Sequence, residues 1–360
     1  MAQKLKKRAS TIKKAATIRQ VAEMANVSIA TVSRVFARTD LVSRELVERV
    51  QNAAQSLNYR PNRIARNLRT QKTFTAAIIV SDIENPFFTS VVRGAEMVLR
   101  KAGYTLLLAN SDEDPQIELE HLLNLRAEGV AGIILAPTHE DFRRYEQFVQ
   151  TDMTIVAIDR FPMNLKIDRV TVNNMEGAQA AVKHLVEQGH AKIGFISGLN
   201  WISTSYERQI GFEQGMKAHK LEVSPEWIQP GSFRRETGFE AMMNILKLSD
   251  RPTAVITANN LMTLGALQAI NECKQRIPAD IAIVGFDDMA WANSLNPPLT
   301  AIAQPTHELG MVAAQLLLAR IEDADRPYRH VILDTQLIIR ESSGPHALLS
   351  LPVRDQVTVV

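Results

Sequence analysis

The spacing of hydrophobic positions near the start of the chain predicts a short amphipathic helix. Thr17 and Gln20 have the spacing of a capping box, in which each side chain satisfies a backbone N–H of the first turn. Val21, Ala22 and Ala25 then form a helical stripe. Asn26 and Val27 break this stripe, so the helix is expected to end there.

A second and a third helix follow with little chain between them. Ser28 can cap the second helix, which is expected to end near Phe36 with Val32 and Val35 turned inward. The third helix is expected over 43–58, again with one apolar face. Three short helices, the first two joined by a tight turn, predict a helix-turn-helix unit.

Charge is distributed unevenly between this region and the rest of the chain. Residues 1–72 contain sixteen Lys and Arg against four Asp and Glu, a net charge of +12, whereas the remaining 288 residues carry −10. A basic head on an acidic body indicates a polyanionic partner for the head alone. For residues 1–16 the composition also fits a solvated, disordered tail.

The second predicted helix presents four side chains outward, those of Ile29, Ala30, Ser33 and Arg34. A helix of this kind fits the major groove of DNA, where a guanidinium can pair bidentately with guanine. The alternative is a three-helix bundle with a basic surface and no DNA role. The charge excess disfavours that alternative, so the head is interpreted as a DNA-binding unit.

From Ala76 onward short apolar runs alternate with amphipathic segments, which is typical of βαβ units with parallel strands. About 270 residues of this pattern exceed one doubly wound domain, so two lobes are expected. The stretch 159–174 interrupts the pattern and is interpreted as the passage between the lobes. Expected strands are 76–80, 105–109, 132–136, 154–158, 192–197, 253–257 and 281–286, and expected helices are 87–101, 116–128, 175–188, 205–218 and 261–274.

Motifs of enzymes with such folds are missing from the sequence. None of the sixteen glycines forms a G-x-G pair, and there is no G-x-x-x-x-G-K-[ST] phosphate loop. The eight histidines are scattered, and His184 and His190, which flank a helix end, are expected in surface or capping roles. Cys273 is the single cysteine, which excludes a disulfide framework. We therefore expect no enzymatic activity, no cofactor and no metal site.

The sequence also lacks membrane signals. The lysine-rich start contains no apolar run of a secretory signal, and no stretch approaches the ~20 apolar residues of a membrane span. We expect a soluble, cytoplasmic protein without a membrane partner.

Beyond these patterns, the chain resembles the lactose-repressor (LacI/GalR) family of transcriptional regulators. The head carries "VAEMANVSIATVSRV" and "YRPNRIARNL", and the body carries "NPFF", "RQIGF", "VGFDD", "AQP" and "LIIRES". The resemblance implies a body with the periplasmic-binding-protein fold, two lobes joined by three crossovers. It implies that Ile29 and Ala30 help set operator preference and that Arg34 reads a base. The candidate DNA contacts of the head are Thr17, Ser28, Ile29, Ala30, Thr31, Ser33 and Arg34.

The segment after Pro61 has two interpretations. From the residues alone, it reads as a flexible linker or as a helix too short to be stable by itself. The resemblance implies a hinge helix that forms only against the hinge helix of a second protomer and the DNA minor groove. In that interpretation Leu68 opens a base step. The candidate hinge contacts are Asn62, Arg63, Ala65 and Leu68.

Several side chains suited to ligand binding stand directly after predicted strands, among them Asn85, Asp159 and Asp287. Ligands of such folds bind near the carboxyl ends of the strands. Two-pronged hydrogen-bonding groups and aromatic rings suit the vicinal hydroxyls and C–H faces of sugars. Taken singly, each has a structural alternative, such as a core Phe87 or a helix-capping Asp287. The resemblance to the ribose-binding branch implies ten effector contacts, namely Asn85, Phe87, Phe88, Asp159, Arg160, Arg208, Phe233, Asn259, Asp287 and Gln304.

Three other positions near the expected cleft affect its chemistry. Asn260 stands where the family usually has an acidic residue, which puts the contacts behind Asn259 in doubt. Trp201 and Trp291 are expected near the cleft mouth, where they can shape selectivity.

Together these features predict a homodimeric repressor that binds pseudo-palindromic operator DNA and responds to a small sugar, a pentose such as ribose or a related ketose. A purine- or nucleoside-responsive repressor of the same family is the alternative, and a solute-binding protein without a DNA role is a further one. The expected domains are a basic tail over 1–16, the helix-turn-helix domain over 17–60, a hinge over 61–73, the two-lobe effector and dimerisation domain over 74–343 and a C-terminal tail over 344–360.

Overall fold

The computed structural model describes residues 16–37, 42–59, 73–139, 141, 143–151, 153–162 and 164–344. The chain divides into two compact units, 1–73 and 74–360. No helix in the described residues is long and apolar enough to cross a membrane. The candidate hinge contacts Asn62, Arg63, Ala65 and Leu68 lie outside the described residues.

The first unit contains the predicted helix-turn-helix. Its helices are α1 (Ile18–Met24), α2 (Ile29–Ala37) and α3 (Arg44–Ser56). Thr17 and Gln20 form the capping box predicted for α1, and the Ser28 hydroxyl accepts a hydrogen bond from the Thr31 N–H at the start of α2. Asn26 takes a positive φ of 49° in the turn between α1 and α2, a conformation that asparagine tolerates better than most residues.

A small apolar core holds these helices together. Val21 from α1, Val32 from α2 and Val50 from α3 are fully buried in it, as the helical periodicity requires. Arg49 of α3 adds a hydrogen bond of 2.7 Å from its Nη2 to the Ala25 carbonyl at the end of α1. The core thus fixes α2 with its opposite face free.

The second unit consists of two lobes, each built on one twisted sheet. Lobe 1 has the strand order β11-β5-β4-β3-β1-β2, with all pairs parallel. Its strands are β1 (Thr75–Val80), β2 (Thr105–Asn110), β3 (Ile133–Leu135), β4 (Ile155–Ile158), β5 (Asp168–Val172) and β11 (His330–Leu333), and its helices are α5 (Pro86–Lys101), α6 (Pro115–Ala127), α7 (Arg143–Val149) and α12 (Thr306–Glu322).

Lobe 2 has the strand order β12-β10-β9-β8-β6-β7. Its strands are β6 (Ile193–Ser197), β7 (Ile228–Pro230), β8 (Ala254–Thr257), β9 (Ala282–Phe286), β10 (Thr300–Ala303) and β12 (Gln336–Ile338), and its helices are α8 (Asn174–Glu187), α9 (Ser203–Ala218), α10 (Arg235–Lys247) and α11 (Asn260–Glu272). Short 3₁₀ helices cover Pro225–Trp227, Ala292–Ser294 and Glu341–Ser343. The strand β12 runs antiparallel to β10, and every other strand pair of this sheet is parallel, as predicted.

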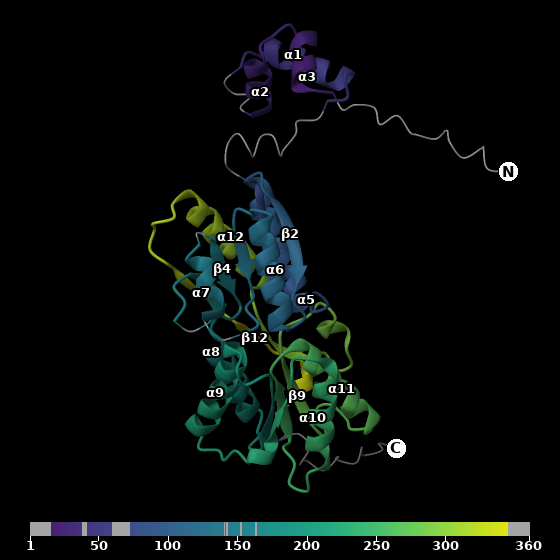
Figure 1. Ribbon diagram of the computed structural model, residues 1–360. Helices are drawn as coiled ribbons and strands as arrows, with labels where there is room; N and C mark the ends of the chain where they lie inside the picture. The colour runs from purple at the N-terminus through teal and green to yellow at the C-terminus, as the bar shows by residue number, and fades with distance from the viewer. Residues whose placement is uncertain are drawn as a thin grey trace, which may run out of the picture. The chain divides into compact units, whose positions relative to one another are not determined.

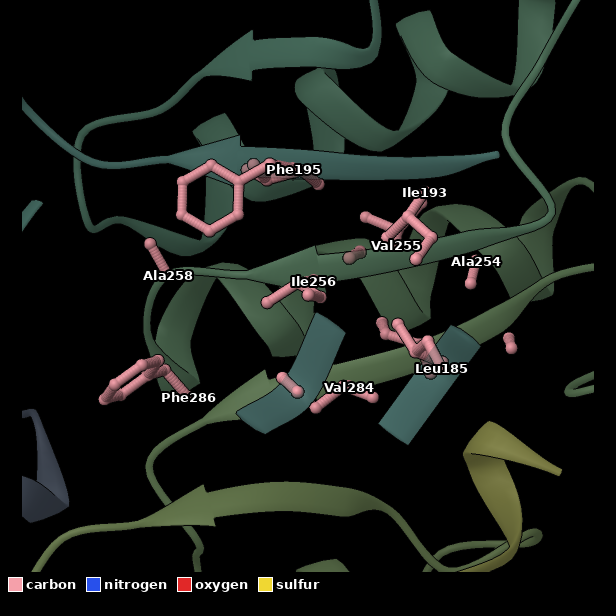
Figure 2. Packing of buried hydrophobic residues seen from close by; sticks show 14 of the residues in the cluster. Leu185, Ile193, Phe195, Ala254, Val255, Ile256, Ala258, Val284 and Phe286 are labelled. Atoms are coloured by element: carbon pink, nitrogen blue, oxygen red, sulfur yellow. The ribbon is translucent and has the colours of Figure 1, made fainter. Parts of the chain in front are cut away.

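Helices cover both faces of each sheet, as doubly wound sheets require. In lobe 1, α5 and α12 pack on one face and α6 and α7 on the other. In lobe 2, α8 and α9 lie on one side of the sheet and α10 and α11 on the other (Figure 1). The core of lobe 2 is continuous across its strands, where Phe195, Ile256 and Val284 lie fully buried (Figure 2).

The described part of the chain crosses between the lobes three times, which confirms the expected connectivity. The crossings lie between β5 and α8, between β10 and α12, and between β11 and β12. Two of them are tied together, because the Asn173 side-chain Oδ1 accepts a hydrogen bond of 2.7 Å from the Thr335 N–H. The interrupted stretch 159–174 does end at a crossing, but it also contains β5, which the sequence pattern missed.

The prediction of surface or capping roles for two histidines is wrong. His184 is 5% exposed and His190 is 2% exposed. The His184 Nε2 lies 2.8 Å from the Ser343 Oγ, and the His190 Nδ1 lies 2.9 Å from the Thr253 Oγ1. Burial lowers the pKa of His184 below its ordinary value, although the charge of Glu187 opposes this. These rings anchor β8 and the last described residues to α8, so their role is structural.

Candidate functional site

A cleft between the two lobes gathers side chains that are far apart in the sequence. The space between atoms in this cleft, including the open solvent at its mouth, is about 530 Å³. All ten side chains predicted as effector contacts line it. Six further lining residues were not predicted, namely Asp82, Asp112, Glu113, Thr204, Ser232 and Arg234.

The cleft forms where strands end and helices begin. Asp159 follows β4 and Asp287 follows β9, and both take positive φ values, 65° and 72°. Aspartate tolerates this conformation better than most residues, and residues held in it cluster at binding sites. Asn85 caps α5 and Asn259 caps α11 through their side-chain oxygens. Four polar side chains are therefore held in place by the backbone geometry at strand ends.

Arg160 forms the centre of an ion-pair network in lobe 1. Its guanidinium donates to both carboxylate oxygens of Glu113, at 2.9 and 2.7 Å, and to the Ser81 hydroxyl at 2.8 Å. Its Nε also lies 3.3 Å from the Asp159 Oδ2. Although burial acts to raise the pKa of Glu113, the charge and hydrogen bonds of Arg160 hold it below the ordinary value. Glu113 therefore stays ionised and fixes the plane of the guanidinium, as bidentate pairs do.

Lobe 2 contributes two buried charged side chains to the cleft, those of Asp287 and Arg208. Asp287 is 4% exposed and accepts hydrogen bonds from the Gln304 side-chain amide and, at 3.3 Å, from the Asn260 backbone N–H. Burial raises the pKa of Asp287 above its ordinary value, and the charge of Arg208 opposes the rise. Arg208 itself donates to the Asn174 Oδ1 at 2.8 Å and lies with its Cζ 3.9 Å from the centre of the Phe286 ring.

Aromatic rings supply the apolar part of the cleft. Phe87 and Phe88 of α5 contact each other edge to face with ring centroids 4.9 Å apart. Phe233 takes a positive φ of 64°, and its carbonyl accepts a hydrogen bond of 3.0 Å from the Asn259 Nδ2. A Cβ on Gly198 would come within 2.2 Å of the Phe233 ring, so only glycine leaves room for that ring.

The cleft combines acceptors, donors and rings in a way that suits an uncharged polar ligand. Asp159 and Asp287 offer carboxylates, Arg160 and Arg208 offer guanidinium groups, and the Gln304 Oε1 is buried without a hydrogen-bond partner among the described residues. No cluster of three or more His, Cys, Asp or Glu side chains that could hold a metal occurs in the described part of the chain.

The residues missed by the sequence prediction had a usable signal. Glu113 lies three positions after β2, in the acidic stretch "SDEDP", and Asp112 and Glu113 both have positive φ values, 53° and 57°. The strand-end rule applied to β2 would have pointed to this loop. The expected tryptophans do not line the cleft: Trp201 lines a smaller neighbouring cavity with Arg160 and Phe161, and Trp291 packs against the core of lobe 2.

The predicted DNA-reading face of α2 is free within its own unit. Ile29 is 43% exposed, Ala30 and Arg34 are also exposed, and Thr31 and Ser33 are half-buried. Ser28 and Thr17 are exposed at the starts of α2 and α1, where their hydroxyls serve as helix caps. The outward set predicted from the sequence therefore lies on one accessible helix face.

Comparison with known proteins places both units in one family. Residues 17–62 match the model of bacterial regulatory proteins of the lacI family, and residues 182–343 match that of periplasmic-binding-protein-like domains. The HTH-type transcriptional repressor PurR of Mannheimia succiniciproducens is 36% identical over 91% of this chain and 98% of its own length. The ribose operon repressor of Haemophilus influenzae is 34% identical over the same shares of both chains.

A solved structure agrees with these relatives. The Lac repressor dimer bound to operator and the anti-inducer ONPF has a TM-score of 0.82 at 26% identity, covering 92% of this chain and all of that one. The curated relatives are transcriptional repressors, so the chain is a regulator and not an enzyme. On this evidence, together with the helix-turn-helix head and the two-lobe body, the chain belongs to the lacI family of bacterial transcriptional regulators.

Proposed function

We propose that this regulator binds pseudo-palindromic operator DNA as a homodimer and that a small sugar in the cleft controls its operator affinity. The sugar is a pentose such as ribose or a related ketose. The observation that supports a sugar ligand is the set of buried carboxylate, guanidinium and amide groups beside phenylalanine rings, contributed by both lobes. Vicinal hydroxyls accept and donate in pairs, and sugar C–H faces stack on rings.

A ligand held by both lobes provides a physical route to control. Asp159 and Arg160 come from lobe 1, and Arg208 and Asp287 come from lobe 2, so a ligand that contacts all four favours the closed cleft. Binding that prefers one arrangement of the lobes shifts the population toward it. Couplings of this kind are typically ~1–3 kcal/mol, and operator DNA then changes sugar affinity by the same factor. Sugar is expected to weaken operator binding.

An exposed apolar surface supports the homodimer. Met97 of α5, Leu107 and Leu108 of β2, and Ile117 and Leu123 of α6 are each 37–48% exposed. The strand β2 is one of the two edge strands of its sheet, and exposed apolar edges are usually covered by a partner. A second copy of this chain fits because a two-fold dimer presents the same surface twice, and two heads then read two half-sites.

The purine-responsive alternative is favoured by one observation. Phe233 and Arg208 can stack on and pair with a planar base as well as with a sugar, and the PurR repressors are among the relatives. A panel of ligands separates the two. Thermal unfolding is measured with D-ribose, D-fructose, ribose 5-phosphate, hypoxanthine and guanine, because a bound ligand raises the melting temperature by mass action. A shift with ribose or a ketose is expected, and a shift with a purine alone would replace the sugar proposal.

Arg34→Ala tests the DNA-binding part of the proposal. Sites are first selected by the wild-type protein from random-sequence duplexes, and inverted half-sites are expected among them. At matched salt, Arg34→Ala is expected to weaken binding to the selected site by about 1–3 kcal/mol, the range for a bidentate base contact. Ligand-induced thermal shifts should be unchanged.

Arg44→Ala is the matched control, because it removes one exposed positive charge from α3 instead of α2. Charge loss alone weakens binding to selected and random DNA alike. Equal losses on both DNAs for Arg34→Ala would show that this side chain contributes charge only, and the base-reading role would be wrong.

A further inference from the structure

A buried hydrogen bond joins the two lobes at the edge of the effector cleft, where its acceptor Asn85 lines the cleft. Asn260, the first residue of α11 in lobe 2, donates from its Nδ2 to the Oδ1 of Asn85 in lobe 1, at 2.8 Å. Asn260 is 1% exposed and Asn85 is 7% exposed, so water does not compete for this bond. Asn260 does not line the cleft, and it therefore acts on the lobes without touching a ligand there.

The helix cap of α5 fixes which of the two side chains donates this hydrogen bond and which accepts it. The Asn85 Oδ1 accepts a hydrogen bond of 2.9 Å from the Phe87 N–H, so an oxygen must face α5 and Asn260. Asn260 must then present its NH₂ group, and the second hydrogen of that group faces the Met289 sulfur at 3.2 Å. A donor at position 260 is therefore required for the lobes to meet in this arrangement.

The surroundings of Asn260 also select against a negative charge. Its backbone N–H donates to the buried Asp287 carboxylate, and its own side-chain oxygen has no hydrogen-bond partner among the described residues. A carboxylate at this position would face the Asn85 oxygen and lie near Asp287, with no donor in return. Opening the lobes would expose such a carboxylate to water, so a negative charge at position 260 favours the open arrangement.

We propose that Asn260 sets the equilibrium between open and closed lobes, holding the cleft in a partly closed state before effector binds. The exposed Arg234–Asp112 pair also spans the lobes, but at 3.9 Å between side chains that are 58% and 63% exposed it contributes little. A ligand that needs the closed state binds more weakly when that state is less populated, by the factor of the population. The residue thus sets effector sensitivity from outside the binding site.

The test measures lobe separation in the full-length protein without ligand. Spin labels on Glu84→Cys in lobe 1 and Glu236→Cys in lobe 2, both exposed positions, report the distance in a Cys273→Ser background. Wild-type protein is expected to show a closed population without sugar. Asn260→Asp should lose it, and Asn260→Ala should reduce it.

D-ribose affinity provides the second readout and rests on the proposed function. Asn260→Ala should weaken ribose binding roughly 2- to 12-fold, the effect of one hydrogen bond, and Asn260→Asp roughly 100-fold or more. Asn271→Asp, which adds the same charge at an exposed position near the end of α11, should stay within about twofold of wild type. The Asn260 substitutions should not change the closed distance reached at saturating ribose.

The outcomes separate the two proposals. A wild-type protein that is fully open without ligand, or closed populations that are unchanged in both Asn260 variants, would overturn the role of Asn260. If wild-type protein fails to bind ribose, the proposed effector is wrong, but the ligand-free distances still decide the role of Asn260. If Asn260→Asp does not fold by circular dichroism, Asn260→Ala decides it alone.

Discussion

Asp287→Ala is expected to abolish the ligand-induced thermal shift while leaving the fold intact. The carboxylate is buried, and removing one partner of a buried charged hydrogen bond typically costs about 2–5 kcal/mol of binding free energy. The change also leaves the Gln304 side-chain amide without its acceptor. Calorimetric titration with D-ribose measures the loss, and Arg160→Ala should produce a comparable one from the opposite lobe.

Asp288→Ala is the control for this prediction. Asp288 is the next residue along the chain, but it does not line the cleft and instead pairs with Arg340 at 2.7 and 2.8 Å. It should therefore lower stability without changing sugar affinity. Wild-type affinity in Asp287→Ala would move the effector site elsewhere.

The raised pKa of Asp287 adds a pH dependence to sugar binding. Because burial raises this pKa, the carboxylate becomes protonated at a higher pH than an exposed aspartate does as the pH falls. Protonation removes an acceptor for sugar hydroxyls. As the pH is lowered, sugar affinity should therefore begin to fall at a pH above the range in which exposed aspartates titrate.

Local rules predicted the helical head because its interactions are local. The capping box of Thr17 and Gln20 is present, and Val21 and Val32 are buried as the periodicity required. The buried core of the head is built from residues between Val21 and Ala54. Helix periodicity and capping chemistry therefore carry most of the information.

Three of the strands missed in the body, β10, β11 and β12, are short or lie at a sheet edge. The strands β10 and β12 are four and three residues long, and β11 lies at a sheet edge with alternate residues exposed. Short or edge strands bury too little apolar surface to stand out as hydrophobic runs. Their pairing is set by the crossovers between lobes, which local pattern does not encode.

The cleft shows the same division between local and long-range information. Asn85, Asp159 and Asp287 could be predicted because their roles follow from standing at a strand end. Glu113 also stands after a strand, but its role in fixing Arg160, 47 positions later in the chain, is not visible in any local pattern. The buried His184 was misplaced for the same reason, since its partner Ser343 lies 159 positions away.

A buried ion pair in lobe 1 carries the largest expected effect on stability. The Asp168 side chain is fully buried and accepts hydrogen bonds from the Arg320 Nε at 2.9 Å and from the Arg329 N–H at 2.8 Å. The Arg320 guanidinium also donates to backbone carbonyls in the segment that joins α12 to β11, including that of Ala324 at 2.8 Å. This arrangement fixes the chain between two of the crossovers.

Asp168→Ala is expected to lower the free energy of unfolding by about 3–5 kcal/mol, because it leaves the Arg320 charge buried without its partner. Urea unfolding followed by far-ultraviolet circular dichroism measures the loss. Asp280→Ala, which breaks the solvent-exposed pair with Arg276, should cost far less. The double variant Asp168→Leu/Arg320→Leu should recover part of the loss, because Arg320 no longer lacks a partner, although Arg326, whose Nη2 lies 3.6 Å from the Asp168 Oδ1, still loses its own. If Asp168→Ala unfolds at the same urea concentration as Asp280→Ala, then Arg320 is held by the backbone carbonyls alone and the ion pair does not secure this part of the lobe.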